Sequence, residues 1–89
     1  MSKILVTDDD TAILELIKIN LELMGHEVIC AENAMKSYAL LLQENPDLVI
    51  LDVMMPEVDG FTLAQRIRNN PDFAQVTILL LTAFGMLDD

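Results

Sequence analysis

The chain has 89 residues, enough for one domain, and a formal net charge of −10. It has only five Lys and Arg residues and no basic cluster, so we do not expect it to bind nucleic acid or an anionic membrane. Apolar residues make up 53% of the chain, which is typical of a folded domain. No segment has the roughly 18 apolar residues of a membrane span, and the N-terminus lacks the pattern of a signal peptide. Cys30 is the single cysteine, so no intrachain disulfide can form, and we expect a cytosolic location.

The first third of the chain alternates between strand-like and helix-like patterns. Residues 3–7 form a short β-branched apolar run that predicts a strand. Apolar side chains then recur at helical spacing over residues 11–24, which predicts a helix that ends at Gly25. We expect the inward face of this helix to carry Leu14, Ile17, Leu21 and Met24, widened by Ile13 and Leu16. The mostly apolar run of residues 27–31 predicts a second strand.

The remainder of the chain repeats the alternation. Asn33 can cap a helix that runs to about residue 43. Residues 48–53 are nearly all apolar, as in a strand buried on both faces of a parallel sheet, and residues 76–82 predict a fourth buried strand. Asp59 can cap the helix "GFTLAQRIRN" between these two strands. In the two helices we expect these side chains to face inward: Met35, Tyr38, Leu41, Leu42, Phe61, Ala64 and Ile67.

The predicted element order implies the fold class. Four predicted strands alternate with three predicted helices along one domain, residues 1–89, without a long linker or internal repeat. Such alternation favours an α/β fold with a doubly wound parallel sheet, right-handed crossovers and helices on both faces.

Acidic side chains follow two of the predicted strands. Asp8 and Asp9 come directly after the first strand, Asp52 lies at the end of the third, and Thr82 ends the fourth. Functional groups in an open parallel sheet collect beyond the carboxyl ends of the strands. If the first and third strands are neighbours, the three carboxylates share one crevice with Thr82 at its rim. Converging carboxylates raise each other's pKa unless a cation joins them, and Mg²⁺ is the cation we expect.

Helix capping is the alternative interpretation of these acids. Acidic residues after a strand often stabilise the start of the next helix. We assign Asp10 to that role and leave it open for Asp8 and Asp9. Asp52 ends a buried strand, where an unpaired charge is costly, and this favours a cation site. A carboxylate beside bound Mg²⁺ can act as a nucleophile and form an aspartyl phosphate.

Three stretches of the chain resemble the receiver domain of two-component response regulators. They are "ILVTDDD" (4–10), "PDLVILDVMMPEVDG" (46–60) and "ILLLTA" (78–83), in the order found in that family. The resemblance implies a flavodoxin-like fold. It implies that Asp52 is a phosphoacceptor, which takes a phosphoryl group from a sensor histidine kinase or a phosphotransfer protein. Such a module has at most weak autophosphatase activity and is not an ordinary enzyme.

The resemblance also implies roles for the residues around Asp52. Asp8, Asp9, Asp52 and the main-chain carbonyl of Met54 would bind Mg²⁺. Thr82 would hydrogen-bond the phosphoryl group, and Ala83 would leave room for it. Pro56 and Gly60 would shape the loop after the phosphoacceptor.

The chain departs from the family pattern at its C-terminus. Receiver domains have five strands and five helices, whereas this sequence stops just after the fourth predicted strand. We therefore expect a truncated domain that lacks the fifth strand, its phosphate-pairing Lys and the last helices. Residues 76–82 would then form an open sheet edge beside an uncovered face, and we expect a homo-oligomer through both.

Two alternatives remain. One is an inert interaction module, or a fragment, that binds Mg²⁺ but does not switch. The other is a phosphatase similar to the haloacid dehalogenases, with Asp8 as nucleophile and Asp10 as acid/base. Replacement of Asp52 by Asn discriminates the receiver from the phosphatase, because only in the receiver should it abolish labelling by acetyl phosphate.

Overall fold

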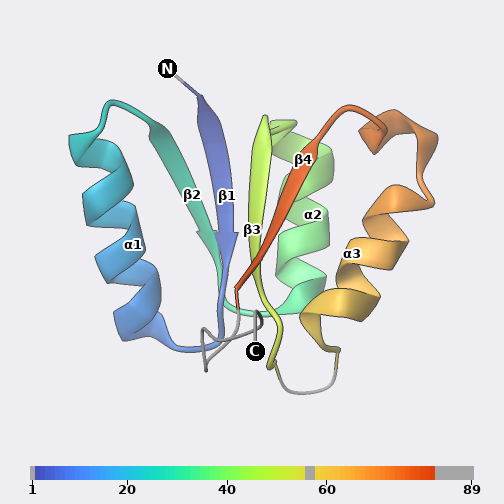
Figure 1. The fold of residues 1–89 in the computed structure, drawn as a ribbon, viewed down its shortest axis with the longest axis horizontal. Helices are drawn as coiled ribbons and strands as arrows, with labels where there is room; N and C mark the ends of the chain where they lie inside the picture. The colour runs from blue at the N-terminus through green and yellow to red at the C-terminus, as the bar shows by residue number, and fades with distance from the viewer. Residues whose placement is uncertain (1, 56–57, 82–89) are drawn as a thin grey trace, which may run out of the picture.

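The computed structural model describes residues 2–55 and 58–81. Within these residues the strands and α-helices follow the order predicted from the sequence, and their bounds differ from the predicted ones by at most one residue (Figure 1). They are β1 (Lys3–Thr7), α1 (Thr11–Leu23), β2 (Glu27–Ala31), α2 (Ala34–Glu44), β3 (Leu48–Asp52), α3 (Gly60–Arg68), a 3₁₀ turn (Pro71–Phe73) and β4 (Thr77–Leu81).

The strands form one parallel sheet in the order β2-β1-β3-β4. β1 therefore lies between β2 and β3, and the strand order switches at β1. Thr7, the last residue of β1, is aligned with Ala31 of β2 and with Leu51 of β3. The predicted doubly wound sheet is confirmed, and the carboxyl ends of β1 and β3 lie side by side (Figure 1).

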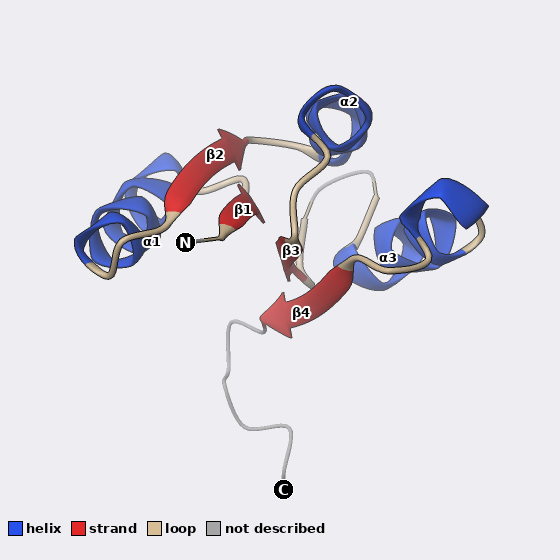
Figure 2. Ribbon diagram, turned by 90° about the horizontal axis from the view of Figure 1, so that it is seen from above, coloured by secondary structure: helices blue, strands red, loops and turns tan. Residues whose placement is uncertain are grey.

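Helices lie on both faces of the sheet. Figure 2 shows α1 on one face, beside β1 and β2, and α2 and α3 on the other. Two cores fill these layers. The larger lies against α2 and α3 and includes Leu5, Leu41, Val49, Leu51, Leu63 and Ile67, and the smaller lies against α1 and includes Ile4, Val6, Leu14 and Ile50. β3 contributes to both cores, as the apolar run of residues 48–53 predicted.

The helix starts follow the predicted capping residues. Asp10 Oδ1 accepts from the Ala12 N–H at 2.9 Å, and Asn33 Oδ1 accepts from the Lys36 N–H at 2.7 Å. Asp59 Oδ1 accepts from the Thr62 N–H at 2.7 Å, and this bond lowers the pKa of the Asp59 carboxyl. These bonds use N–H groups that have no partner within the helix, so each cap fixes where its helix begins.

The predicted inward faces of the helices are too wide. Leu14, Leu41 and Ile67 are buried as expected, but other predicted side chains are 41–82% exposed. A helix on a sheet buries only a stripe, and the side chains next to that stripe need a further element to cover them. The exposed side chains are Ile13, Leu16, Met24, Met35, Leu42 and Phe61.

β4 is less buried than predicted. Its five residues are all exposed or half-buried, and Leu79 is 48% exposed. Among the described residues, no strand pairs with the outer edge of β4. On the face of the sheet where α1 packs, α1 lies beside β1 and β2, and no described helix lies over β4 (Figure 2). The burial predicted for residues 76–82 therefore holds for Val76 and is wrong for residues 77–81, whereas the predicted place of this strand at the sheet edge is correct.

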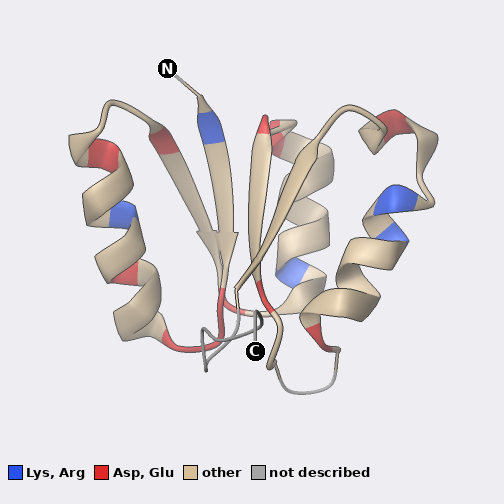
Figure 3. Cartoon of the chain, viewed as in Figure 1, with Lys and Arg blue, Asp and Glu red and all other residues tan. Residues whose placement is uncertain are grey.

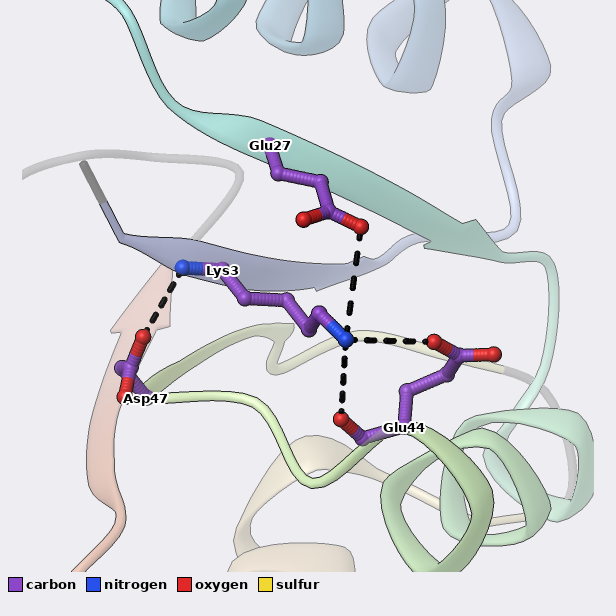
Figure 4. Close-up of polar contacts among 4 residues, drawn as sticks. All are labelled: Lys3, Glu27, Glu44 and Asp47. Atoms are coloured by element: carbon purple, nitrogen blue, oxygen red, sulfur yellow. Dashed lines mark hydrogen bonds and ion pairs between the residues drawn. The ribbon is translucent and has the colours of Figure 1, made fainter.

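Lys3 ties several elements together at the amino ends of the strands (Figure 4). Its Nζ donates to the Glu44 carbonyl at 3.2 Å and to Glu44 Oε1 at 3.4 Å, and it lies 4.0 Å from Glu27 Oε2. The Lys3 N–H donates to Asp47 Oδ2 at 2.9 Å. β1, β2 and the end of α2 are thereby linked at the end of the sheet opposite to Asp8, Asp9 and Asp52.

Residues 2–55 and 58–81 contain no helix that is both long enough and apolar enough to cross a membrane.

Candidate functional site

Asp8, Asp9 and Asp52 meet at the carboxyl edge of the sheet. One oxygen of each carboxylate lies within 4.8 Å of the others. Figure 3 shows acidic segments at the ends of β1 and β3 converging on this edge. The exposure of the three side chains differs: Asp8 is buried, Asp52 is half-buried and Asp9 is exposed. The three carboxylates thus lie together, as expected from the sequence, whereas Thr82, predicted beside them, lies outside the described residues.

Asp8 is held by hydrogen bonds on both its main chain and its side chain. Its N–H donates to the Ala31 carbonyl at 3.1 Å, which extends the β1–β2 ladder by one residue. Its Oδ1 accepts from the Asp10 N–H at 2.9 Å. Burial raises the pKa of the Asp8 carboxyl, and the nearby charges of Asp52 and Asp9 raise it further, against the opposing effect of the Asp10 N–H.

Asp52 is the last residue of β3 and lies opposite Leu81 of β4. The Val53 N–H donates to the Leu81 carbonyl at 2.8 Å, so the chain stays attached to β4 as it leaves β3. Asp52 Oδ1 accepts from the Met54 N–H at 3.1 Å. The carboxylate therefore faces the loop after β3 with one oxygen anchored, and it remains accessible.

Gly60 packs directly against the main chain of Asp52. The Gly60 N–H donates to the Val53 carbonyl at 2.9 Å. A Cβ at Gly60 would lie 2.5 Å from the Asp52 carbonyl oxygen and 2.9 Å from Val53 Cα, both closer than real Cβ contacts. Only glycine lets α3 begin this close to Asp52, which agrees with the predicted role of Gly60 in shaping the loop.

The donor set suits a hard divalent cation. All three converging ligands are carboxylate oxygens, and Mg²⁺ prefers oxygen ligands. Burial is the main reason that the pKa of Asp8 is raised, and the charges of Asp52 and Asp9 add to it; a bound cation would offset that repulsion. An accessible carboxylate among cation ligands can serve as a nucleophile toward a phosphoryl group.

The other predicted site residues are only partly described. Met54 lies in the loop after Asp52, with its side chain 55% exposed. Pro56, Thr82 and Ala83 lie outside the described residues. Asp10 caps α1, as predicted, and this use of its side chain disfavours the role of acid/base in the phosphatase alternative.

Sequence reasoning missed a buried polar pair next to the site. Thr7 Oγ1 and Ser37 Oγ lie 2.6 Å apart, and both residues are 1% exposed. A signal was available: Ser37 falls at a helical spacing from Ala34 and Leu41, the other buried residues of α2. A polar residue on an inward face indicates a buried hydrogen bond.

Comparison with known proteins identifies the family. The family model named "Response regulator receiver domain" matches residues 4–89. The chain belongs to this family. The receiver-like fold and the recognition made from the sequence motifs are both confirmed.

Receiver-containing relatives and solved structures support the assignment. The chain is 47% identical over 89 residues to the DNA-binding dual master transcriptional regulator RpaA of Synechocystis, a match that covers all of this chain and 37% of RpaA. The chain spans about a third of the length of the curated relatives it matches.

Two solved structures come from Thermotoga maritima. The response regulator TrrA in complex with Mg(2+)-BeF is 41% identical with a TM-score of 0.86, and the match covers 93% of this receiver chain and 70% of that chain. The second is a complex of the histidine kinase ThkA with TrrA. It is 38% identical with a TM-score of 0.89, and covers 100% of this chain and 75% of that one.

Proposed function

We propose that this receiver chain accepts a phosphoryl group on Asp52 from a phosphohistidine of a sensor histidine kinase or a phosphotransfer protein. Phosphorylation then changes which proteins the chain contacts. The observation that carries the proposal is the convergence of Asp8, Asp9 and Asp52 at one sheet edge in a member of the receiver family. The ThkA–TrrA complex supports a histidine kinase as the partner.

Asp52 is the proposed nucleophile because its carboxylate is accessible and one oxygen is already anchored by the Met54 N–H. A carboxylate oxygen of Asp52 forms a bond to phosphorus while the phosphorus–nitrogen bond of the phosphohistidine breaks. The imidazole leaves with the electron pair of that bond and takes up a proton. The acyl phosphate carries nearly two negative charges, enough to bias neighbouring loops. Hydrolysis of the acyl phosphate by the chain itself would be weak.

Asp8, Asp9, Asp52 and the main-chain carbonyl of Met54 are the groups that would hold Mg²⁺. The TrrA complex with Mg(2+)-BeF supports this choice of ion. When bound, Mg²⁺ supplies positive charge that offsets the repulsion between the carboxylates and an incoming phosphoryl group. The buried position of Asp8 and the bond from the Asp10 N–H keep its carboxylate oriented toward Asp52 and Asp9.

Thr82 and Ala83 are the proposed contacts of the phosphoryl group. Their support is their place in the sequence, directly after Leu81, which lies opposite Asp52 and whose carbonyl accepts a hydrogen bond from the Val53 N–H. A Thr hydroxyl can donate to a phosphoryl oxygen, and a small side chain at Ala83 leaves the group accessible.

The assembly state and location complete the proposal. We propose that a second copy of the chain covers the outer edge of β4 and the apolar face around Leu79, because exposed strand edges and apolar patches favour association. We also propose that residues 1–89 belong to one receiver domain and that it works in the cytosol, as expected from its single cysteine.

Acetyl phosphate labelling with an intact-mass readout tests the function. With Mg²⁺ present, the chain should gain the mass of one phosphoryl group, and Asp52→Asn should gain none. Asp72→Asn is the matched control, since Asp72 is an exposed aspartate of the 3₁₀ turn, and it should label like the wild type. Labelling that persists in Asp52→Asn, or that maps to Asp8, would overturn the assignment. Mg²⁺ binding without any phosphoprotein would instead identify an inert interaction module.

A further inference from the structure

Thr7 and Ser37 form a buried pair of hydroxyl groups between two elements that are distant in sequence. Thr7 ends β1 and Ser37 lies in the first turn of α2, and their hydroxyl oxygens are 2.6 Å apart. Both residues are 1% exposed, so neither hydroxyl can turn to water for a partner. A buried hydroxyl without a hydrogen bond is costly in free energy. Because separating the two hydroxyls would incur that cost, the pair holds the end of β1 and the start of α2 at hydrogen-bond distance.

The pair lies immediately next to the acidic site. Asp8 follows Thr7 directly, and its N–H is bonded to the Ala31 carbonyl of β2. β2 leads within three residues into α2, whose start is fixed by the Asn33 cap. The main chain at Asp8 is thus held from one side by β2, and the residue before it is held by Ser37.

Apolar side chains could fill the same space, but they would not fix the position of α2 relative to β1 as a hydrogen bond does. Hydrophobic contact has no preferred direction, whereas a hydrogen bond restricts both distance and angle. The other buried residues of α2, Ala34 and Leu41, are apolar and belong to the core against this face of the sheet. The hydroxyl pair is therefore a buried directional contact between β1 and the start of α2, whereas the bonds from Lys3 to Glu44 lie at the other end of that helix.

We infer that Thr7 and Ser37 are a positioning pair that sets the place of Asp8 in the acidic site, and so the affinity of the site for its cation. This inference rests on the proposed function in one respect, the use of Asp8 as a cation ligand. Neither hydroxyl touches the cation or the phosphoryl group. Their effect passes through the main chain from Thr7 to Asp8.

The test compares four variants of the whole chain: Thr7→Val, Ser37→Ala, the double variant with both changes, and Thr7→Ser. Each single loss leaves the other hydroxyl buried without a partner and should lower the melting temperature. The double variant removes both polar groups, so its melting temperature should return toward that of the wild type. Thr7→Ser keeps the hydroxyl but loses a core methyl group, so it should melt earlier than the wild type.

Two further readouts separate positioning from stability. Isothermal titration with Mg²⁺ should show a dissociation constant raised about tenfold in the double variant and unchanged in Thr7→Ser, although Thr7→Ser melts earlier than the wild type. Hydrogen exchange of the Asp8 amide should be faster in the double variant than in the wild type, with or without Mg²⁺.

Two results would overturn the inference. One is a double variant with the affinity and the Asp8 exchange rate of the wild type. The other is a Mg²⁺ affinity that merely follows the melting temperature across all four variants. If the wild type itself binds no Mg²⁺, the proposed function fails, and the exchange rate of the Asp8 amide then decides separately whether the pair holds Asp8.

Discussion

At the scale of single residues, three chemically identical side chains differ in their surroundings. Asp8 is buried and receives a main-chain hydrogen bond, Asp52 is half-buried at the end of β3, and Asp9 is exposed. The burial of Asp8 makes its charge costly in the absence of a cation. The accessibility of Asp52 suits a group that has to meet a partner's phosphoryl group.

The raised pKa of Asp8 predicts a pH dependence of stability in EDTA. Because the folded chain holds the Asp8 proton more tightly than the unfolded chain, stability should fall as pH rises from the ordinary value of 3.8 through the raised pKa. Asp8→Asn removes this charge, so at neutral pH in EDTA it should melt at a higher temperature than the wild type. Thermal unfolding across pH measures both effects, with Asp72→Asn as the control. An Asp8→Asn variant that melts earlier at neutral pH would contradict this account of the site.

Gly60 predicts a steric effect on the site. Gly60→Ala places a Cβ against the main chain of Asp52 and Val53, so α3 or the loop must shift. We expect a loss of about 1–3 kcal/mol in unfolding free energy, as for other overpacked positions, together with weaker labelling by acetyl phosphate.

Gly25→Ala is the matched control for Gly60→Ala. Gly25 has a φ of 93° and nothing within 4 Å of a built Cβ, and it lies in the turn between α1 and β2. Its replacement should cost about 1 kcal/mol through backbone strain and leave labelling unchanged. Equal loss of labelling in the two variants would show that Gly60 acts only through global stability.

At the scale of elements, the ends of the helices were predictable because they depend on local chemistry. Asp10, Asn33 and Asp59 each stand before a helical pattern, and each accepts a hydrogen bond from the first turn of its helix. Strand positions were predictable for a similar reason, since apolar runs such as residues 48–53 indicate burial on both faces.

The capping bond of Asn33 predicts a measurable contribution to stability. Asn33→Ala removes the acceptor of the Lys36 N–H and should lower the unfolding free energy by about 1 kcal/mol. Urea denaturation measures the loss as a lower midpoint at an unchanged slope. Asn33→Asp keeps an acceptor at the helix start and should retain most of the stability. A midpoint unchanged by Asn33→Ala would show that the start of α2 depends on packing instead.

The features that could not be predicted depend on which elements lie side by side. The sequence pattern treats Met35, Leu42 and Phe61 as core candidates, yet they are 56–82% exposed in the structure. The pairing of Thr7 with Ser37 is hidden for the same reason, because it joins residues 30 positions apart. The acidic site could be predicted only on the condition that the first and third strands are neighbours, because neighbouring parallel strands bring their carboxyl ends together. The strand order β2-β1-β3-β4 meets that condition.

At the scale of the whole molecule, the two ends of the sheet differ in how their charged residues are arranged. Lys3 ties β1, β2 and α2 together at the amino end, where the ion pairs are half-exposed. The carboxyl end gathers like charges that have no basic partner among the described residues. The ion pairs of Lys3 and the candidate site thus lie at opposite ends of the strands.

The exposed apolar face predicts self-association. Leu79 is 48% exposed at the edge strand β4, and a second copy of the chain would bury it. Light scattering after size-exclusion chromatography should give the mass of a dimer for the wild type and of a monomer for Leu79→Lys. Met35→Lys is the control: Met35 is 82% exposed on α2, which covers the opposite face of the sheet, and the variant should remain dimeric. A wild-type chain that stays monomeric at high concentration would refute the proposed dimer.

The central claim is that Asp8, Asp9 and Asp52 together form one cation site. An NMR titration of the ¹⁵N-labelled chain with Mg²⁺ tests it most directly. We predict that the amide signals of these three residues and of Met54 shift along a single saturating binding curve, and that the curve is lost or strongly weakened in Asp52→Asn. Signals that do not saturate, or that shift around Asp8 and Asp9 while Asp52 and Met54 stay unchanged, would contradict the account.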